Sequence, residues 1–466
     1  MVFSSLTFLL VFLPLLYILY FALSSPRWRN GVLLAMSLLF YGWGEPLWIL
    51  AMLISTFANF FCARALTRTD SEPRRRAILA VGVLFSLSFL FYFKYSSFFA
   101  NSLAKLFGLG WRAADKRLPI GISFYTFQIL TYTVDVYRRK APALESPLRL
   151  LLYISCFPQL IAGPIVQYAD VADQLAERRI LPDEFTAGLQ RFIKGLAKKV
   201  LLANVCGAAM EELTLAGTGA ALSLLGAWMA AFLYTLQIYF DFSAYSDMAI
   251  GLGRTLGFRY KENFRFPYAS LSVSEFWRRW HISLGSFFRD YVYIPLGGNR
   301  RGAPRTVLNL LIVWALTGLW HGASWNFVLW GLYFGVLLIL ERFVFASLIE
   351  KTPRAIRWAL SFVIAVVGWV IFYYTDLSAL SQALGALFGV GISGWSDAAS
   401  LAVLRSYGVW ALVAFVLSLP VVPLVSERLP EKLRGALGLV LTLLLFAASL
   451  LFLIGQSYNP FIYFRF

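Results

Sequence analysis

Two histidines, His281 and His321, are the residues of this chain best suited to move protons. Histidine is the one side chain whose unperturbed pKa lies near neutral pH. His321 lies within residues 306–340, which contain no Asp, Glu, Lys or Arg. An ionisable group in so apolar a segment indicates a functional site, and burial would keep the imidazole neutral and able to accept a proton as a general base. The alternative is a histidine that only packs and hydrogen-bonds a neighbouring helix.

His281 has a weaker case on its own residues, because it directly follows a segment of tryptophans and arginines. Such residues gather at membrane interfaces in any case, so a packing role at an interface is also open. The arginines could instead seat an anionic acyl donor, since guanidinium groups bind phosphate in a bidentate manner. The residues predicted to bind that donor are Arg278, Arg279, Arg289, Trp277 and Trp280.

Four further polar residues are candidates to support the histidines: Asp241, Asp247, Ser324 and Asn326. The last two follow His321 closely and could line a cavity, while Gly318 and Gly322 would permit close helix approach or a local break. Asp241 and Asp247 are six residues apart and so lie on different faces of a regular helix. One of them could orient an imidazole, or both could form ion pairs between helices. No cysteine or acidic cluster has metal-ligand spacing, so no metal site is predicted.

The composition that surrounds these residues is that of a membrane protein. Hydrophobic residues make up 59% of the chain and charged residues only 14%, whereas soluble domains carry about 25% charged residues. Apolar runs of about 20 residues recur, which is the length that a helix needs to cross a bilayer. We therefore predict an all-α, polytopic membrane protein with about ten to twelve transmembrane helices, in a single domain over residues 1–466.

Two segments depart from the apolar pattern. Residues 170–200 combine charges with apolar residues at helical spacing, which predicts an amphipathic helix at the inner membrane interface, although a solvated linker helix is the alternative. Residues 254–305 carry many charges and two prolines but are also rich in aromatic residues. Short interfacial or re-entrant helices fit that composition best, and His281 would lie among them.

The net charge of +17 resides in the loops between the apolar runs, so it indicates cytoplasmic anchoring and not a nucleic-acid partner. Placing the basic clusters at 27–29, 74–76 and 138–140 inside puts the N-terminus outside. We predict that residues 6–23 form the first transmembrane helix and are not cleaved, because they lack the preceding basic segment that a signal peptide has. Nucleotide-binding glycine motifs and a GxSxG nucleophile motif are absent from the sequence.

Long motifs give the chain a resemblance to a known family. They are FYGWGEP at 40–46, LPIGISFYTFQ at 118–128, FPQLIAGPIVQY at 157–168, QIYFDFSAYSDMAIGLG at 237–253, NFRFPYASLSVSEFWRRWHISLGSFFRDYVYIPLGGNR at 263–300, TGLWHGASWNFVLWG at 317–331 and QSYNPFIYFRF at 456–466. In this order they resemble the membrane-bound O-acyltransferases, and within that family the branch that O-acetylates bacterial alginate. The resemblance extends over nearly the whole chain.

The resemblance implies a helical fold around a tunnel through the bacterial inner membrane. It implies that His321 is the essential histidine of an acetyltransferase and His281 the second one. Acetyl-CoA would be the cytoplasmic donor, with no permanently bound cofactor. Periplasmic acetyltransferase partner proteins would complete the transfer to a polysaccharide, with the protein embedded in the lipid bilayer.

Other functions remain open at this stage. The resemblance extends to systems that acetylate peptidoglycan or cellulose and to teichoic-acid D-alanylation. A transporter or flippase of an acylated carrier could use the histidines as a proton relay, but its signature of paired broken helices in two repeats is not found in the sequence. A structural scaffold would give no reason for a polar centre in an apolar span.

Overall fold

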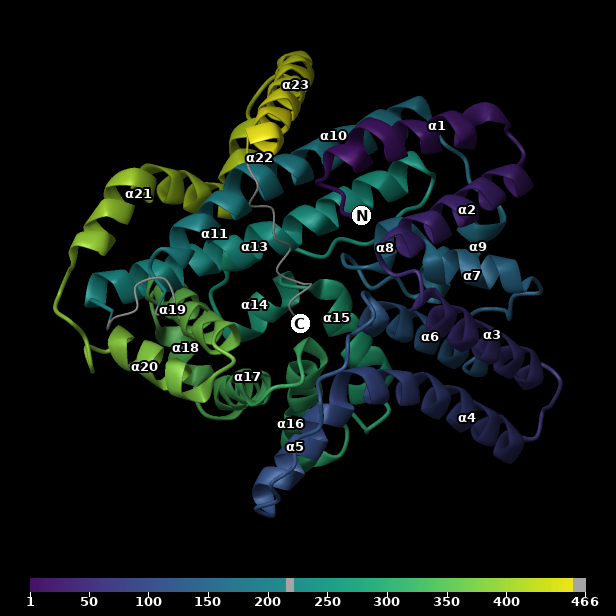
Figure 1. The fold of residues 1–466 in the computed structure, drawn as a ribbon, viewed down its shortest axis with the longest axis horizontal. Coiled ribbons are helices and arrows are strands. Elements are labelled where there is room, and N and C mark those ends of the chain that lie inside the picture. The colour runs from purple at the N-terminus through teal and green to yellow at the C-terminus, as the bar shows by residue number, and fades with distance from the viewer. Residues whose placement is uncertain (215–221, 456–466) are drawn as a thin grey trace. The chain divides into compact units, whose positions relative to one another are not determined.

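The computed structural model describes residues 1–214 and 222–455, and within these ranges the chain forms helices and no strands (Figure 1). The terminal motif at 456–466 lies outside the described residues. The chain divides into two compact units, Met1–Phe192 with Ser246–Glu262, and Ile193–Tyr245 with Asn263–Phe466. The all-helical prediction is confirmed, and the predicted single domain stays a prediction.

The first unit consists mainly of the N-terminal helices, of which α3, α4 and α6 pack against one another (Figure 1). Proline in the first turn begins several of these helices, where its missing N–H costs no hydrogen bond. The elements are η1 (Phe8–Phe12), α1 (Leu13–Ala22), α2 (Pro26–Gly44), α3 (Ile49–Leu66), α4 (Glu72–Leu90), η2 (Phe91–Tyr95), α5 (Ser96–Leu106), α6 (Ile122–Tyr137), α7 (Pro147–Ser155), α8 (Phe157–Leu160), α9 (Tyr168–Ala176) and the greater part of α10 (Pro182–Ala197).

The second unit contains both histidines. Its elements are the end of α10, η3 (Lys198–Ala203), α11 (Asn204–Glu211), most of α13 (Leu224–Thr255), η4 (Pro267–Ala269), α14 (Val273–Arg279), α15 (Ile282–Phe288), η5 (Arg289–Tyr293), α16 (Gly302–His321), α17 (Trp325–Phe343), α18 (Ala346–Lys351), α19 (Arg354–Tyr373), α20 (Leu377–Leu387), α21 (Ala398–Ser418), α22 (Val421–Ser426) and α23 (Glu431–Gly455). Helices α16 and α17 pack as a hairpin, and α14 and α19 both contact α17.

Seven helices in the described ranges are long and apolar enough to cross a membrane: Ile49–Leu66, Glu72–Leu106, Gly302–His321, Trp325–Phe343, Arg354–Tyr373, Ala398–Ser418 and Glu431–Gly455. They confirm the prediction of a multi-pass helical membrane protein, while the predicted total of about ten to twelve crossings stays a prediction. The most apolar window, in Glu431–Gly455, is only 11% buried. Most side chains of this helix therefore face away from the rest of the protein, as in a membrane helix that contacts lipid.

The two unusual segments form shorter helices. Residues 170–200 contain the two helices α9 and α10 instead of one, because the chain is not helical between Ala176 and Pro182. Within α10, Arg191 is only a quarter exposed, because carboxylates of the same unit surround it. Residues 254–305 contain the short elements η4, α14, α15 and η5 around His281, while their interfacial or re-entrant placement stays a prediction.

Helix α14 is held by acceptors at its N-terminus, where the N–H groups of a helix lack intrahelical partners. The Ser272 hydroxyl accepts from the Glu275 N–H at 3.1 Å. The Glu341 carboxylate of α17 accepts from the N–H groups of Val273 at 2.7 Å and Ser274 at 3.1 Å. A carboxylate is favourable at a helix N-terminus, so α14 is fixed against α17, and Trp280 then joins α14 to His281.

Candidate active site

His321 is the last residue of α16, at the turn of the α16–α17 hairpin. The chain is extended at Gly322, and α17 begins three residues later. A side chain at Gly318 would collide with the Phe327 carbonyl oxygen, and one at Gly331 with the Trp314 carbonyl oxygen. Glycine therefore lets the two backbones touch, and the close helix approach predicted from Gly318 is what the structure shows.

The His321 imidazole is buried among aromatic rings, with only 5% of the residue exposed. Its ring centroid lies 4.9 Å from Trp320, 4.9 Å from Trp330 and 5.1 Å from Phe372, each in an edge-to-face arrangement. Edge-to-face packing fixes the plane of a ring. A buried imidazole held in one orientation is the arrangement that general-base catalysis requires.

The two polar residues after the hairpin turn occupy different positions. Asn326 is fully buried, and its side-chain amide donates to the carbonyl oxygens of Ile371 at 3.2 Å and Phe372 at 3.0 Å. These carbonyls belong to the last turn of α19, where helix acceptors lack intrahelical partners. Asn326 thus supports the ring of Phe372 beside His321, while Ser324 is the partly buried residue that precedes α17.

His281 joins α14 to α15 and has a left-handed backbone, with φ +43° and ψ +54°. Non-glycine residues in this region are uncommon and cost about 1–3 kcal/mol, and they cluster at functional sites. The side chain is 1% exposed and its ring lies 4.6 Å from that of Phe242. The left-handed backbone at His281 turns the chain between α14 and α15, and the imidazole lies buried at this turn.

Asn263 fixes the protonation of His281. Its side-chain oxygen Oδ1 accepts from the Ser283 backbone N–H at 3.1 Å and from the Ser283 hydroxyl at 2.8 Å, and it lies 3.2 Å from His281 Nδ1. Because a backbone N–H can only donate, the atom facing Nδ1 is an oxygen, and Nδ1 must carry the hydrogen. The neutral tautomer therefore leaves Nε2 as the acceptor nitrogen. Burial also lowers the pKa of His281 to about 3.

Trp320 connects the two histidines. Its ring centroid is 4.9 Å from that of His321 and 5.7 Å from that of His281, so both imidazoles pack against one indole. The structure thus brings together two residues that are forty positions apart. The sequence analysis did not identify Trp320 and Asn263 as site residues. The available signals were that Trp320 directly precedes His321 and that Asn263 is the first residue of the motif that contains His281.

The predicted donor-binding residues divide into core and surface. Trp277 packs 4.7 Å from Trp314, and Trp280 packs 4.5 Å from Trp369, so both indoles belong to the aromatic core. The three arginines are more accessible, and their pairing differs. Arg278 is exposed, Arg279 forms an ion pair with Glu275 at 2.5 Å, and Arg289 forms one with Asp290 at 2.7 Å while its side chain remains 63% exposed.

The two aspartates of α13 form ion pairs. Asp241 is bound by the Lys199 ammonium at 2.5 Å, with both side chains less than 5% exposed. In the first unit, Asp247 is bound by Arg191 at 2.9 Å, and Arg191 also binds Glu262 at 2.5 Å. Ion pairing between helices, one of the two alternatives for these residues, is therefore what these contacts show. Cations buried in this way need such carboxylates, because an unpaired buried charge is strongly unfavourable.

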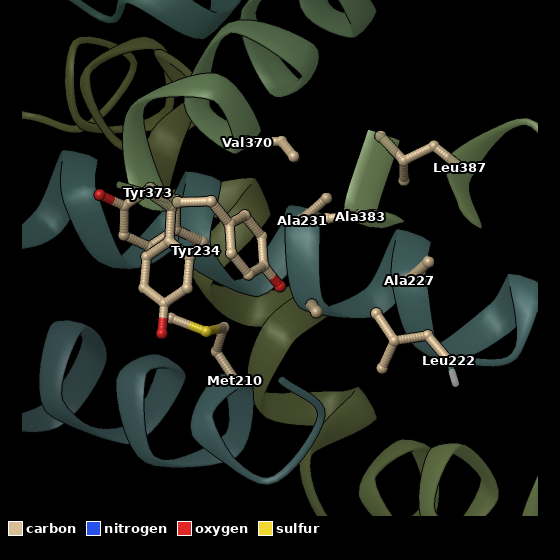
Figure 2. Close-up of a pocket in the computed structure, with 11 residues that line it drawn as sticks. Met210, Leu222, Ala227, Ala231, Tyr234, Val370, Tyr373, Ala383 and Leu387 are labelled. Carbon is tan, nitrogen blue, oxygen red and sulfur yellow. The ribbon is translucent and has the colours of Figure 1, made fainter. Parts of the chain in front are cut away.

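A cavity of about 210 Å³ opens beside His281. Residues of α14, α15, η5 and α16 line it, including Trp277, Leu284, Arg289 and Thr317. A smaller pocket, of about 20 Å³, lies between α11, α13, α19 and α20 (Figure 2).

Apolar side chains and the three tyrosines Tyr234, Tyr373 and Tyr374 line this smaller pocket, which Figure 2 shows. The rings of Tyr234 and Tyr373 are 4.8 Å apart in it. It has room for about one water molecule and contains neither histidine. The cavity beside His281 is therefore the candidate binding site. In the described ranges, no three His, Cys, Asp or Glu side chains gather in a group that could hold a metal ion.

Comparison with known proteins assigns the family. Residues 136–380 match the model of the membrane-bound O-acyltransferase family (MBOAT). Similar proteins include two probable alginate O-acetylases AlgI, from Pseudomonas putida (39% identical) and Azotobacter vinelandii (38% identical), each matched over 100% of both chains. A peptidoglycan O-acetyltransferase from Helicobacter pylori is 32% identical over 84% of this chain and 81% of its own length. This chain belongs to the membrane-bound O-acyltransferase family and is an O-acyltransferase.

Proposed function

We propose that the protein transfers acetyl groups from acetyl-CoA on the cytoplasmic side of the bacterial inner membrane for O-acetylation of an exopolysaccharide on the outer side. The observation that carries this proposal is the pair of buried histidines that both pack against Trp320. The names of the relatives, which include probable alginate O-acetylases, support a polysaccharide acceptor. Alginate is the acceptor we propose, with periplasmic partner proteins that complete the transfer.

In the proposed reaction, His321 accepts the proton of an incoming hydroxyl group. The hydroxyl oxygen forms a bond to the acyl carbonyl carbon, and the carbon–sulfur bond of the thioester breaks. The departing sulfur takes a proton, so the products are an acetyl ester and free CoA. General-base assistance of this kind contributes about 10²–10⁴-fold in rate. The buried, ring-packed imidazole of His321 suits that role, either as the base or as the group that orients the hydroxyl.

His281 has a complementary role in this proposal. With Nδ1–H directed to Asn263, its Nε2 remains an acceptor that can receive a hydrogen bond or a proton. Its low pKa keeps the imidazole uncharged at neutral pH. A neutral acceptor beside the cavity would orient the donor or the acceptor hydroxyl without placing a positive charge in the core.

The donor would enter from the side that carries the arginines. Arg278 is exposed and Arg289 is 63% exposed beside the cavity, so their guanidinium groups are accessible to the phosphates of CoA. The positive-inside rule supports a cytoplasmic location for the basic loops and an N-terminus on the outer side. The basic residues would thus meet the anionic end of the donor, while the acyl end would enter the aromatic interior.

The experiment that tests the proposal replaces His321. In a strain whose own copy is deleted, His321→Ala should lower acetylation of the exported polysaccharide by about 10²–10⁴-fold. The purified variant should likewise release free CoA from acetyl-CoA more slowly. The matched control is Leu316→Ala, which removes an exposed side chain from the same helix and should leave both readouts unchanged. Full acetylation by an inserted His321→Ala variant would exclude the proposed role.

The same assay separates the acceptors. Acetyl groups on exported alginate would support the acceptor proposed above. Acetylation of peptidoglycan instead would favour the alternative represented by the Helicobacter pylori relative. Movement of an acylated carrier without release of free CoA would favour a transporter and would contradict the proposed acyl transfer.

A further inference from the structure

The segment between α5 and α6 is basic on the side of the membrane where positive charge is least expected. Residues 105–117 contain four basic side chains and one acidic side chain. The predicted orientation puts this segment outside, because one crossing separates it from the inner cluster at 74–76 and another from the inner cluster at 138–140. Lysine and arginine normally accumulate in cytoplasmic loops. Membrane topology therefore gives no reason for this charge, whereas an anionic partner on the outer side would.

The segment exposes its charges together with two aromatic rings. Phe107 is 69% exposed and Trp111 is 53% exposed, at the end of α5, which bends away from α4 (Figure 1). Apolar side chains exposed among polar ones mark binding sites in many proteins. We refer to the two rings and the four exposed basic side chains as the outer loop surface, which consists of Lys105, Phe107, Trp111, Arg112, Lys116 and Arg117.

The loop that carries this surface is fixed to the helices before it. The Asn101 side chain donates to the Ala113 carbonyl oxygen at 3.2 Å and accepts from the Ala113 N–H at 2.7 Å. The Lys116 ammonium lies 3.8 Å from the centroid of the Tyr92 ring and donates to the Ser96 hydroxyl oxygen at 2.6 Å. A surface held in place before binding loses less conformational entropy when a ligand binds.

Arg117 connects the surface to another motif of the sequence. Its guanidinium is 71% exposed and lies 3.3 Å from the Glu45 carboxylate, which belongs to the motif at 40–46 and is only 3% exposed. The Met1 amino group also interacts electrostatically with Glu45. The predicted orientation requires the N-terminus, Glu45 and Arg117 to share one side of the membrane, and these contacts support that requirement.

The mixture of charges and rings matches one class of anionic ligand. Alginate, the acceptor of the proposed function, is a polymer of uronic acids, so every repeat unit has a carboxylate and a sugar ring with an apolar face. Basic side chains bind carboxylates through charge-assisted hydrogen bonds, and Trp and Phe offer large flat apolar faces. An acidic polypeptide matches only the charges, and anionic lipids attract basic segments to the cytoplasmic leaflet, which is the opposite side.

We propose that the outer loop surface binds the acceptor polysaccharide as a polyuronate. Its basic side chains contact the carboxylates, and Phe107 and Trp111 pack on the faces of the sugar rings. The inference rests on the proposed function, which supplies the polymer and the outer side. It adds that this chain itself binds the polymer, through residues of the first unit, whereas both histidines belong to the second unit.

The test measures binding of short oligomers cleaved from alginate to the full-length protein, without any acyl donor. The protein is held in nanodiscs of phosphatidylcholine, a lipid without net charge. The wild type should bind the oligomers, and binding should weaken between about 0.1 M and 1 M salt, because the Debye length falls from about 10 Å to about 3 Å. Oligomers whose carboxylates have been reduced to alcohols should bind at least about tenfold more weakly.

Variants separate the role of the charges from that of the rings. The double variant Lys105→Gln with Arg112→Gln should bind about 2–30-fold more weakly, with a shallower salt dependence. Trp111→Ala should bind about 2–10-fold more weakly, with the salt dependence of the wild type. The matched control, Arg68→Gln with Arg74→Gln, removes two exposed charges from the predicted inner side and should bind like the wild type.

Several results would overturn the inference. One is wild-type affinity in both the Lys105→Gln, Arg112→Gln double variant and Trp111→Ala, and another is equal binding of the reduced oligomers. Tighter binding of oligoglutamate than of the uronate oligomers would assign the surface to an acidic polypeptide instead. Tighter binding of glycerophosphoglycerol would assign it to lipid headgroups.

A parallel measurement of acyl transfer separates this inference from the proposed function. If the wild type binds the oligomers but releases no CoA from acetyl-CoA, the proposed function is wrong while the assignment of the surface stands. If it acetylates alginate in the deletion strain but does not bind the oligomers, the inference is wrong while the proposed function stands.

Discussion

Asn263 offers the sharpest test of how the fold prepares His281. Its side-chain oxygen is the acceptor for three groups, namely the Ser283 N–H, the Ser283 hydroxyl and His281 Nδ1. Replacing Asn263 with aspartate keeps an oxygen at this position and adds a negative charge 3.2 Å from the imidazole. Replacing it with alanine removes the acceptor altogether.

The magnitudes follow from the geometry. An opposite charge this close raises the pKa of a histidine by about one to three units, so Asn263→Asp should raise the pKa of His281 from about 3 to about 4–6. Each unit corresponds to about 1.4 kcal/mol in favour of the charged imidazole. Asn263→Ala leaves the Ser283 N–H and the His281 Nδ1–H without an acceptor, whereas the Ser283 hydroxyl can rotate. At about 1–3 kcal/mol for each N–H, this predicts a loss of about 2–6 kcal/mol in the free energy of unfolding.

The wild type itself has a defined pH dependence. Because its folded pKa lies below the unfolded value, neutral His281 contributes stability that is fully present above about pH 6.5. That contribution is lost progressively as the pH falls from about 6.5 toward 3. The Asn263→Asp variant should lose less stability over this pH range, because the carboxylate stabilises the imidazolium.

Imidazole nitrogen NMR is well suited to this test, because the chain contains only two histidines. In protein labelled with 15N-histidine, a His281→Gln variant identifies the His281 signals. We expect the Nδ1–H tautomer with no titration between pH 5 and 8 in the wild type, and titration near pH 4–6 in Asn263→Asp. The Nε2–H tautomer, or a wild-type pKa near 6.5, would refute the reasoning.

Two other predictions concern the packing of the same unit. Lys199→Met should lower the free energy of unfolding by about 3–5 kcal/mol, because it removes the cation that binds the buried Asp241. The double variant Lys199→Met with Asp241→Leu should recover most of this loss. A Lys199→Met single variant as stable as the wild type would contradict the prediction. Gly318→Ala should cost about 1–3 kcal/mol and most of the activity, because its Cβ would collide with the Phe327 carbonyl. Gly435→Ala, which meets no atom within 4 Å, is the matched control and should be neutral or slightly stabilising in thermal unfolding.

The segments that could be predicted from sequence are those whose structure depends on local composition. An uncharged run that contains His321 is sufficient to predict a membrane helix with a polar group in it, since hydrophobicity over about 20 residues decides crossing. The prolines and charges of 254–305 likewise predict short helices, and the structure contains four short elements there. The charged pattern of 170–200 was less informative, because periodicity alone did not reveal the break between α9 and α10.

The ion pairs show where such reasoning stops. Asp241 and Asp247 are similar in sequence context, and their spacing left open whether either one orients an imidazole. Their partners Lys199 and Arg191 come from residues more than forty positions earlier in the chain. Partner choice over such distances depends on how helices pack, which helical periodicity does not specify.

The sequence by itself determined the class of the protein: an all-helical membrane acyltransferase with two histidines as its candidates for proton transfer. Its hydrophobic lengths, charge distribution and long motifs are local properties of the chain. Only the tertiary structure decided that both imidazoles pack against Trp320, that Asn263 fixes the tautomer of His281, and that a cavity opens beside His281. These features arise from contacts between elements far apart in sequence, and close packing of side chains fixes them only once the whole unit has folded.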